Sequence, residues 1–145
     1  MSNRRLLHEI AIFLILVSIL FVIGCSKNSH EPIILTQQED SPWDLLLLTP
    51  PGKLIIDNSG YIRFSIPHEH DKPVIIWPHG FTLKIDGSDV WVLNEKSEPQ
   101  VRIGDTTPLG GGFIEESSVT KVIGYSLPAD IPGPFFMAGH HIPGK

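Results

Sequence analysis

The sequence is poor in cysteine, because Cys25 is the only one among its 145 residues. A single thiol cannot form an intramolecular disulfide, so packing and hydrogen bonds must stabilise the fold. Basic residues are also few: 11 lysines and arginines stand against 16 aspartates and glutamates, and they form no run. The formal net charge of −5 and the lack of a basic cluster argue against nucleic acid as a partner.

Long apolar runs are equally scarce, since the one long run spans residues 10–23 and is interrupted by Ser18. As a helix rising about 1.5 Å per residue, it would extend only about 21 Å, whereas the hydrocarbon core is roughly 30 Å thick. Extension back to Leu6 would bring His8 and Glu9 into or near the bilayer, where ionisable groups are costly. A permanent transmembrane helix is therefore the less favoured interpretation.

The amino terminus instead has the parts of an export signal, with Arg4 and Arg5 before the apolar run. The run ends in Val22-Ile23-Gly24-Cys25, which resembles the lipobox of a bacterial lipoprotein signal peptide. This resemblance covers the first 25 residues and implies cleavage before Cys25, transfer of a diacylglyceryl group to its sulfur, and anchoring on the extracytoplasmic face of the cell membrane. Two acyl chains hold a protein stably, whereas one does so only marginally. The alternative is a buried free thiol.

Residues 1–24 are therefore interpreted as signal peptide, which leaves 121 residues with nine basic and fifteen acidic side chains, a net charge of −6. Residues 25–50 are expected to comprise the lipidated cysteine, a flexible tether over 26–40 and a short helix or strand. The tether is polar apart from one apolar cluster at Ile33–Leu35. As a coil it would span about 20 Å. Residues 51–145 are expected to form a single small domain.

From Lys53 onward, short apolar segments alternate with turn residues, which is typical of an all-β domain. The turns at 57–60 and 86–89 predict two hairpins, since Asn, Asp and Gly tolerate positive φ. Residues 74–77 are continuously apolar and predict a strand covered on both faces. A further strand is expected near 101–103, a closing strand near 134–138, and a short helix that ends at Gly124.

About six short strands with one short helix predict a small antiparallel barrel (OB-like) or a sandwich. The barrel is favoured because closure removes exposed strand edges, and the helix is expected to plug one end as in OB-like barrels. Gly110–Gly112 indicate a close backbone approach, a bulge at a barrel corner or a flexible loop. Trp43 and the leucines at 45–48 are expected to cover an edge of the core.

Four short motifs resemble a group of small uncharacterised bacterial exported proteins, over roughly residues 74–139. They are Trp77-Pro78-His79-Gly80-Phe81 with Leu83, Val101-Arg102-Ile103-Gly104-Asp105, Gly110-Gly111-Gly112 and Pro132-Gly133-Pro134-Phe135-Phe136. The resemblance implies one compact extracytoplasmic domain. It implies no activity and no catalytic residues.

The residues themselves give no support for an enzyme. No serine lies in a Gly-x-Ser-x-Gly elbow, and no Ser-x-x-Lys pair has its supporting motifs. The carboxylates between Asp86 and Asp105 fall mostly in expected turns, where aspartate bonds to its own backbone. We therefore expect no catalytic function.

A metal site is the main chemical alternative, because His68 and His70 alternate on an extended segment and would point the same way. His79 is a candidate third ligand. Imidazoles of this kind suit zinc, copper or nickel. The opposing interpretation is an exposed polar loop between two prolines.

Aromatic side chains make the other candidate site, with Trp91, Trp77 and Tyr61 as a possible binding surface and most other rings in the core. The sequence thus predicts a lipid-anchored, extracytoplasmic binding module whose partners are membrane lipid, through Cys25, and an envelope protein or polymer. A metal-binding lipoprotein that uses the His-x-His loop is the alternative.

Overall fold

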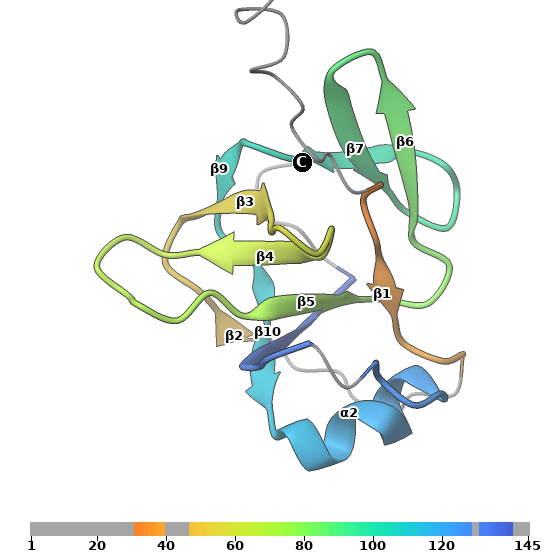
Figure 1. The fold of residues 1–145 in the computed structure, drawn as a ribbon. Coiled ribbons are helices and arrows are strands. Elements are labelled where there is room, and N and C mark those ends of the chain that lie inside the picture. Colours follow the sequence, from red (N-terminus) through yellow and green to blue (C-terminus); the bar gives the residue numbers. More distant parts are fainter. Residues whose placement is uncertain (1–30, 40–46, 129–130, 141–145) are drawn as a thin grey trace, which may run out of the picture.

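A computed structural model describes residues 31–39, 47–128 and 131–140, and shows an all-β fold with one short helix (Figure 1). Cys25, the predicted signal peptide and Trp43 lie outside these residues. The predicted fold class is confirmed. In chain order the elements are β1 (Leu35–Thr36), β2 (Leu47–Leu48), β3 (Gly52–Ile56), β4 (Ile62–Ser65), β5 (Val74–Trp77), β6 (Thr82–Asp86), β7 (Asp89–Leu93), β8 (Pro99–Arg102), β9 (Thr106–Thr107), β10 (Gly110–Ile114), α2 (Glu116–Ile123) and β11 (Phe135–Ala138).

The larger sheet is curled into a half-barrel, called the barrel below. Its order is β2-β10-β11-β5-β4-β3-β9, with β1 added beside β5. At the two ends of this order, β2 leads into β3 and β9 leads into β10. Between these pairs, the Thr49 N–H donates to the Leu109 carbonyl at 2.9 Å, and the Leu109 N–H donates to the Thr49 hydroxyl oxygen at 2.9 Å. The pairing is mixed rather than purely antiparallel, because β5 runs parallel to both β11 and β1.

Strand β5 explains how this barrel is filled and covered. Ile75 and Trp77 belong to the interior cluster, whereas Val74 and Ile76 belong to an outer cluster on the opposite face of the sheet. The prediction of a strand covered on both faces is therefore confirmed. The interior cluster consists of Leu54, Ile62, Phe64, Ile66, Ile75, Trp77, Phe81, Val92, Val101, Leu109, Phe136 and Ala138.

The second sheet, β6-β7-β8, supplies part of this interior. The expected hairpin is present, with Leu83 paired to Val92 and Val92 paired in turn to Val101. Val92 and Val101 are buried in the interior cluster, and Leu83 packs against it. The outer part of the hairpin projects from the barrel (Figure 1), and Ile85 near its tip is exposed.

Helix α2 covers the outside of the barrel, so the expectation that it plugs one end is wrong. Its buried residues Val119, Val122 and Ile123 pack in the outer cluster with residues of β5 and β11. The three-stranded sheet already contributes to the interior, which leaves the outer face of the larger sheet for the helix. As expected, the helix ends at Gly124, whose φ is +81° and whose N–H donates to the Thr120 carbonyl.

Residues 31–39 belong to the domain, so the predicted tether over 26–40 is wrong for its described part. The Ile33 N–H donates to the Gly60 carbonyl at 2.8 Å, and β1 then pairs with β5. Leu35 is buried in the outer cluster, and the Gln37 side chain donates to the Ala138 carbonyl at 3.0 Å. The apolar cluster at 33–35 was the sequence signal for this docking.

The glycine triplet marks a close backbone approach, the first of the three interpretations. A Cβ at Gly111 would lie 2.0 Å from the Met137 carbonyl oxygen and 2.8 Å from the Phe136 ring. Its φ of +146° is also a conformation that side chains with a Cβ rarely adopt. Strands β10 and β11 can pair here only because this position has no side chain.

Candidate functional site

Two of the three predicted surface aromatics lie in the core. Trp77 is fully buried and its ring stacks on Phe81 with centroids 6.1 Å apart. Tyr61 is buried in the outer cluster beneath β1. The prediction of a binding surface at Trp77 and Tyr61 is therefore wrong, because β1 and the interior of the barrel cover the faces on which these rings lie.

Trp91 is partly exposed on the outward face of the three-stranded sheet. The register places it between Lys84 on β6 and Arg102 on β8. The Arg102 guanidinium carbon lies 5.9 Å from the ring centroid, within the range of a cation–π contact. Part of the indole face is therefore already occupied by a side chain of the same domain.

Carboxylates surround the two cations on this face. Arg102 Nη2 lies 3.0 Å from Asp105 and Nη1 lies 3.6 Å from Asp89, and Lys84 lies 3.7 Å from Asp86. The hydrogen bond and charge of Asp105, with the charge of Asp89, raise the pKa of Arg102 above its usual range, so it stays charged. Three carboxylates against two cations leave the Trp91 face without a net positive field for an anionic ligand.

The three candidate histidines, His68, His70 and His79, do not gather into a metal site in the described part of the chain. His68 and His70 are exposed on the loop between β4 and β5, and His79 is exposed in the turn after β5. Across residues 31–39, 47–128 and 131–140, no group of three or more His, Cys, Asp or Glu side chains is placed to hold a metal ion. Zinc or copper binding through the His-x-His loop stays a prediction. Among the described residues, no third ligand lies with His68 and His70.

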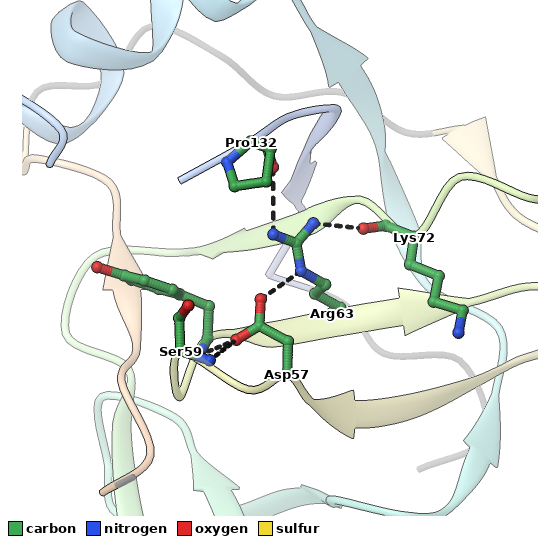
Figure 2. A network of polar contacts seen from close by, with 6 residues as sticks. Asp57, Ser59, Arg63, Lys72 and Pro132 are labelled. Carbon is green, nitrogen blue, oxygen red and sulfur yellow. Dashed lines mark hydrogen bonds and ion pairs between the residues drawn. The ribbon is translucent and has the colours of Figure 1, made fainter. Parts of the chain in front are cut away.

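The best-connected polar cluster centres on Arg63 of β4 (Figure 2). Its Nε donates to Asp57, Nη1 to the Lys72 carbonyl at 2.8 Å and Nη2 to the Pro132 carbonyl at 3.1 Å. The other Asp57 oxygen accepts the N–H groups of Ser59 and Tyr61, at 2.9 and 3.0 Å. The side chains of Arg63 and Asp57 are only 11% and 19% exposed. The cluster connects the β3–β4 turn, the β4–β5 loop and the segment before β11, so its role is to stabilise the fold.

Asp57 gives this cluster a dependence on pH. Burial acts to raise its pKa, but hydrogen bonds from Arg63, Tyr61 and Ser59 outweigh burial and hold the pKa below the usual 3.8. A carboxyl group whose pKa is lowered by folding stabilises the fold above its unfolded pKa. That stabilisation is lost as the pH falls through the folded value.

We therefore expect the stability difference between the native protein and Asp57→Asn to be constant above about pH 5 and to shrink below about pH 4. Urea denaturation followed by tryptophan fluorescence at a series of pH values measures it. Asp86→Asn is the matched control, since its carboxylate is exposed. A difference for Asp57→Asn that did not change with pH would contradict this assignment.

An exposed apolar surface lies where β2 pairs with β10. Leu47 and Leu48 are 71% and 62% exposed, and Phe113 of β10 is 58% exposed. Leu47 lies opposite Gly111, so it shares a face of the sheet with Phe113, two residues further along β10. The Phe113 ring meets the buried Phe136 edge-on, with centroids 5.4 Å apart. Leu48 lies opposite Gly110, so its side chain points to the other face at the same margin of the sheet. We call Leu47, Leu48 and Phe113 the apolar edge.

The expectation that the leucines cover an edge of the core is wrong for Leu47 and Leu48. They pair with Gly111 and Gly110, which offer no side chain to pack against, so both leucines project into solvent. The signal in the sequence was a leucine run and a glycine triplet. Only the pairing of two segments some sixty residues apart shows that they face each other.

Comparison with protein-family models, with curated proteins and with solved structures found no match for this chain. In the part of the chain that the structure describes, no helix combines the length and the apolar character needed to cross a membrane.

Proposed function

We propose that this protein is a lipid-anchored module of the bacterial cell envelope that binds an envelope protein through the apolar edge. Cys25 holds the domain on the extracytoplasmic face of the membrane, and the domain acts by binding and not by catalysis. The observation that carries the binding role is the exposure of apolar side chains at one margin of a sheet, Leu47 and Phe113 on one face and Leu48 on the other.

This surface suits a protein partner better than a polymer. Burial of such side chains contributes about 1–2 kcal/mol each at this degree of exposure. In addition, among the described strands β2 pairs only with β10, so its other side offers backbone groups for strand addition. A glycan would favour an open aromatic face with polar neighbours, and the Trp91 face is partly covered by Arg102.

Site-specific photo-crosslinking in intact cells tests this proposal. A crosslinker in place of Leu48 is expected to capture one protein reproducibly, whereas a crosslinker in place of Lys121, exposed on α2, is not. Leu47→Asp is expected to lower the yield at position 48 by more than about tenfold, with a stability change within about 0.5 kcal/mol because Leu47 is exposed. Equal capture at both positions, or a yield indifferent to Leu47→Asp, would count against the apolar edge.

The anchor has an independent readout. Mass spectrometry of the mature amino terminus is expected to show a lipid on Cys25, and Cys25→Ala is expected to block that maturation. An unmodified full-length native chain would overturn the anchoring part of the proposal and leave the binding part to the crosslinking result.

A further inference from the structure

The docking of residues 31–39 leaves little chain between the domain and the anchor. Only residues 26–30 separate Cys25 from Glu31, the first residue that the structure describes. Six residue steps span at most about 20–22 Å when fully extended, and about 13 Å as a flexible coil. A domain of this length has a diameter of about 35 Å. The connection from Cys25 to Glu31 is therefore shorter than the diameter of the domain.

The two ends of this docked segment contact opposite parts of the domain. At its start, the Ile33 N–H bonds to Gly60 in the turn between β3 and β4. At its end, the Gln38 N–H donates to the Val122 carbonyl, and the Gln38 side chain donates to the Lys121 carbonyl at 2.8 Å. Five extended residues cover about 17 Å. Figure 1 shows β1 running along the side of the barrel towards α2.

We infer that the end of the barrel that carries Ile33 and the β3–β4 turn faces the lipid headgroups, with α2 directed away from the membrane. This inference rests on the proposed lipidation of Cys25. A short connection that enters at Ile33 holds that end near the bilayer, and the body of the domain, excluded from the lipid, extends to the other side. Ile33 is 39% exposed and offers an apolar contact at this end.

The lipid-facing end has a defined composition. Ser59 in the turn is exposed, as is Glu31 at the start of the described segment. No lysine or arginine lies in the turn, residues 57–60, or in residues 31–34. Figure 1 shows the β6–β7 hairpin projecting at the same end, where the exposed Lys84 lies 3.7 Å from Asp86. The carboxylates of Glu31, Asp57 and Asp86 outnumber this one cation. The covalent connection, more than attraction to anionic lipid, therefore sets the orientation, and we expect salt to change it little.

Fluorescence quenching on vesicles tests the orientation. Ser59→Cys and Lys121→Cys place the same thiol-reactive fluorophore at the two ends, since the thiol of Cys25 is blocked by lipid. The lipidated proteins are reconstituted into phosphatidylcholine and phosphatidylglycerol vesicles that carry a headgroup nitroxide. We expect the label at position 59 to be quenched roughly twofold more than that at 121, because the two positions adjoin opposite ends of a segment that extends about 17 Å.

A lengthened connection is the matched control. Insertion of about fifteen Gly and Ser residues between Ser29 and His30 frees the domain to tumble and is expected to abolish the difference between the two labels. Equal quenching with the native connection, in protein that floats with the vesicles, would overturn the orientation and leave the anchor intact. Protein that does not float at all would overturn the anchor, and the orientation with it.

Discussion

Gly111→Ala is expected to destabilise the protein strongly. The new Cβ would overlap the Met137 carbonyl oxygen at 2.0 Å and the Phe136 ring at 2.8 Å. A backbone carbonyl in a paired strand cannot move aside without breaking the ladder between β10 and β11. Overpacking and the strain of φ +146° together predict a loss of about 3–5 kcal/mol.

A loss of this size is a large share of the 5–15 kcal/mol that stabilises a typical domain. Urea denaturation followed by tryptophan fluorescence measures it. Gly87→Ala is the control: its φ of +62° is also positive, but nothing lies within 4 Å of the new Cβ, so we expect a cost of only about 1 kcal/mol. Similar costs for the two variants would show that the close approach of β10 and β11 does not constrain the fold.

Arg63→Met is expected to be the most destabilising substitution of a charged residue. It leaves the Asp57 carboxylate without its cation and removes the donors to the Lys72 and Pro132 carbonyls (Figure 2). Both charged side chains are more than four-fifths buried, so water can replace the lost hydrogen bonds and the lost cation only in part. We expect a loss of about 2–4 kcal/mol, measured by urea denaturation at neutral pH.

Further variants separate the causes. Arg63→Lys keeps the charge but lacks the planar fork that serves three acceptors, so its loss should be intermediate. Arg102→Met, at an exposed cluster, should change stability much less. The double variant Asp57→Asn with Arg63→Met should lose less stability than the sum of the losses in the two single variants, because the two residues interact. Additive losses would contradict the described pairing.

Local sequence signals were sufficient where a structure depends on near neighbours. The two hairpins follow from turn residues that tolerate positive φ, and the helix end follows from Gly124. The double burial of β5 follows from four consecutive apolar residues. Each of these features depends on residues within one turn or one strand, so the local sequence is sufficient to predict it.

The candidate sites depended on contacts between distant segments and were predicted less well. Tyr61 and Trp77 are aromatic whether buried or exposed, and their burial depends on β1 and on the barrel interior. Trp91 alone of the three kept an outward position. The apolar edge was missed because its exposure is a property of the pairing between leucines and glycines.

The sequence by itself determined the all-β class, the hairpins and the short helix, because alternation, turn residues and helix ends act over a few residues. Only the tertiary structure decided that α2 covers the outside of the barrel, that residues 31–39 belong to the domain and that Leu47, Leu48 and Phe113 are exposed at one margin of the sheet. The physical reason is that burial is settled by what packs against a side chain. For these residues, the partners lie far away along the chain.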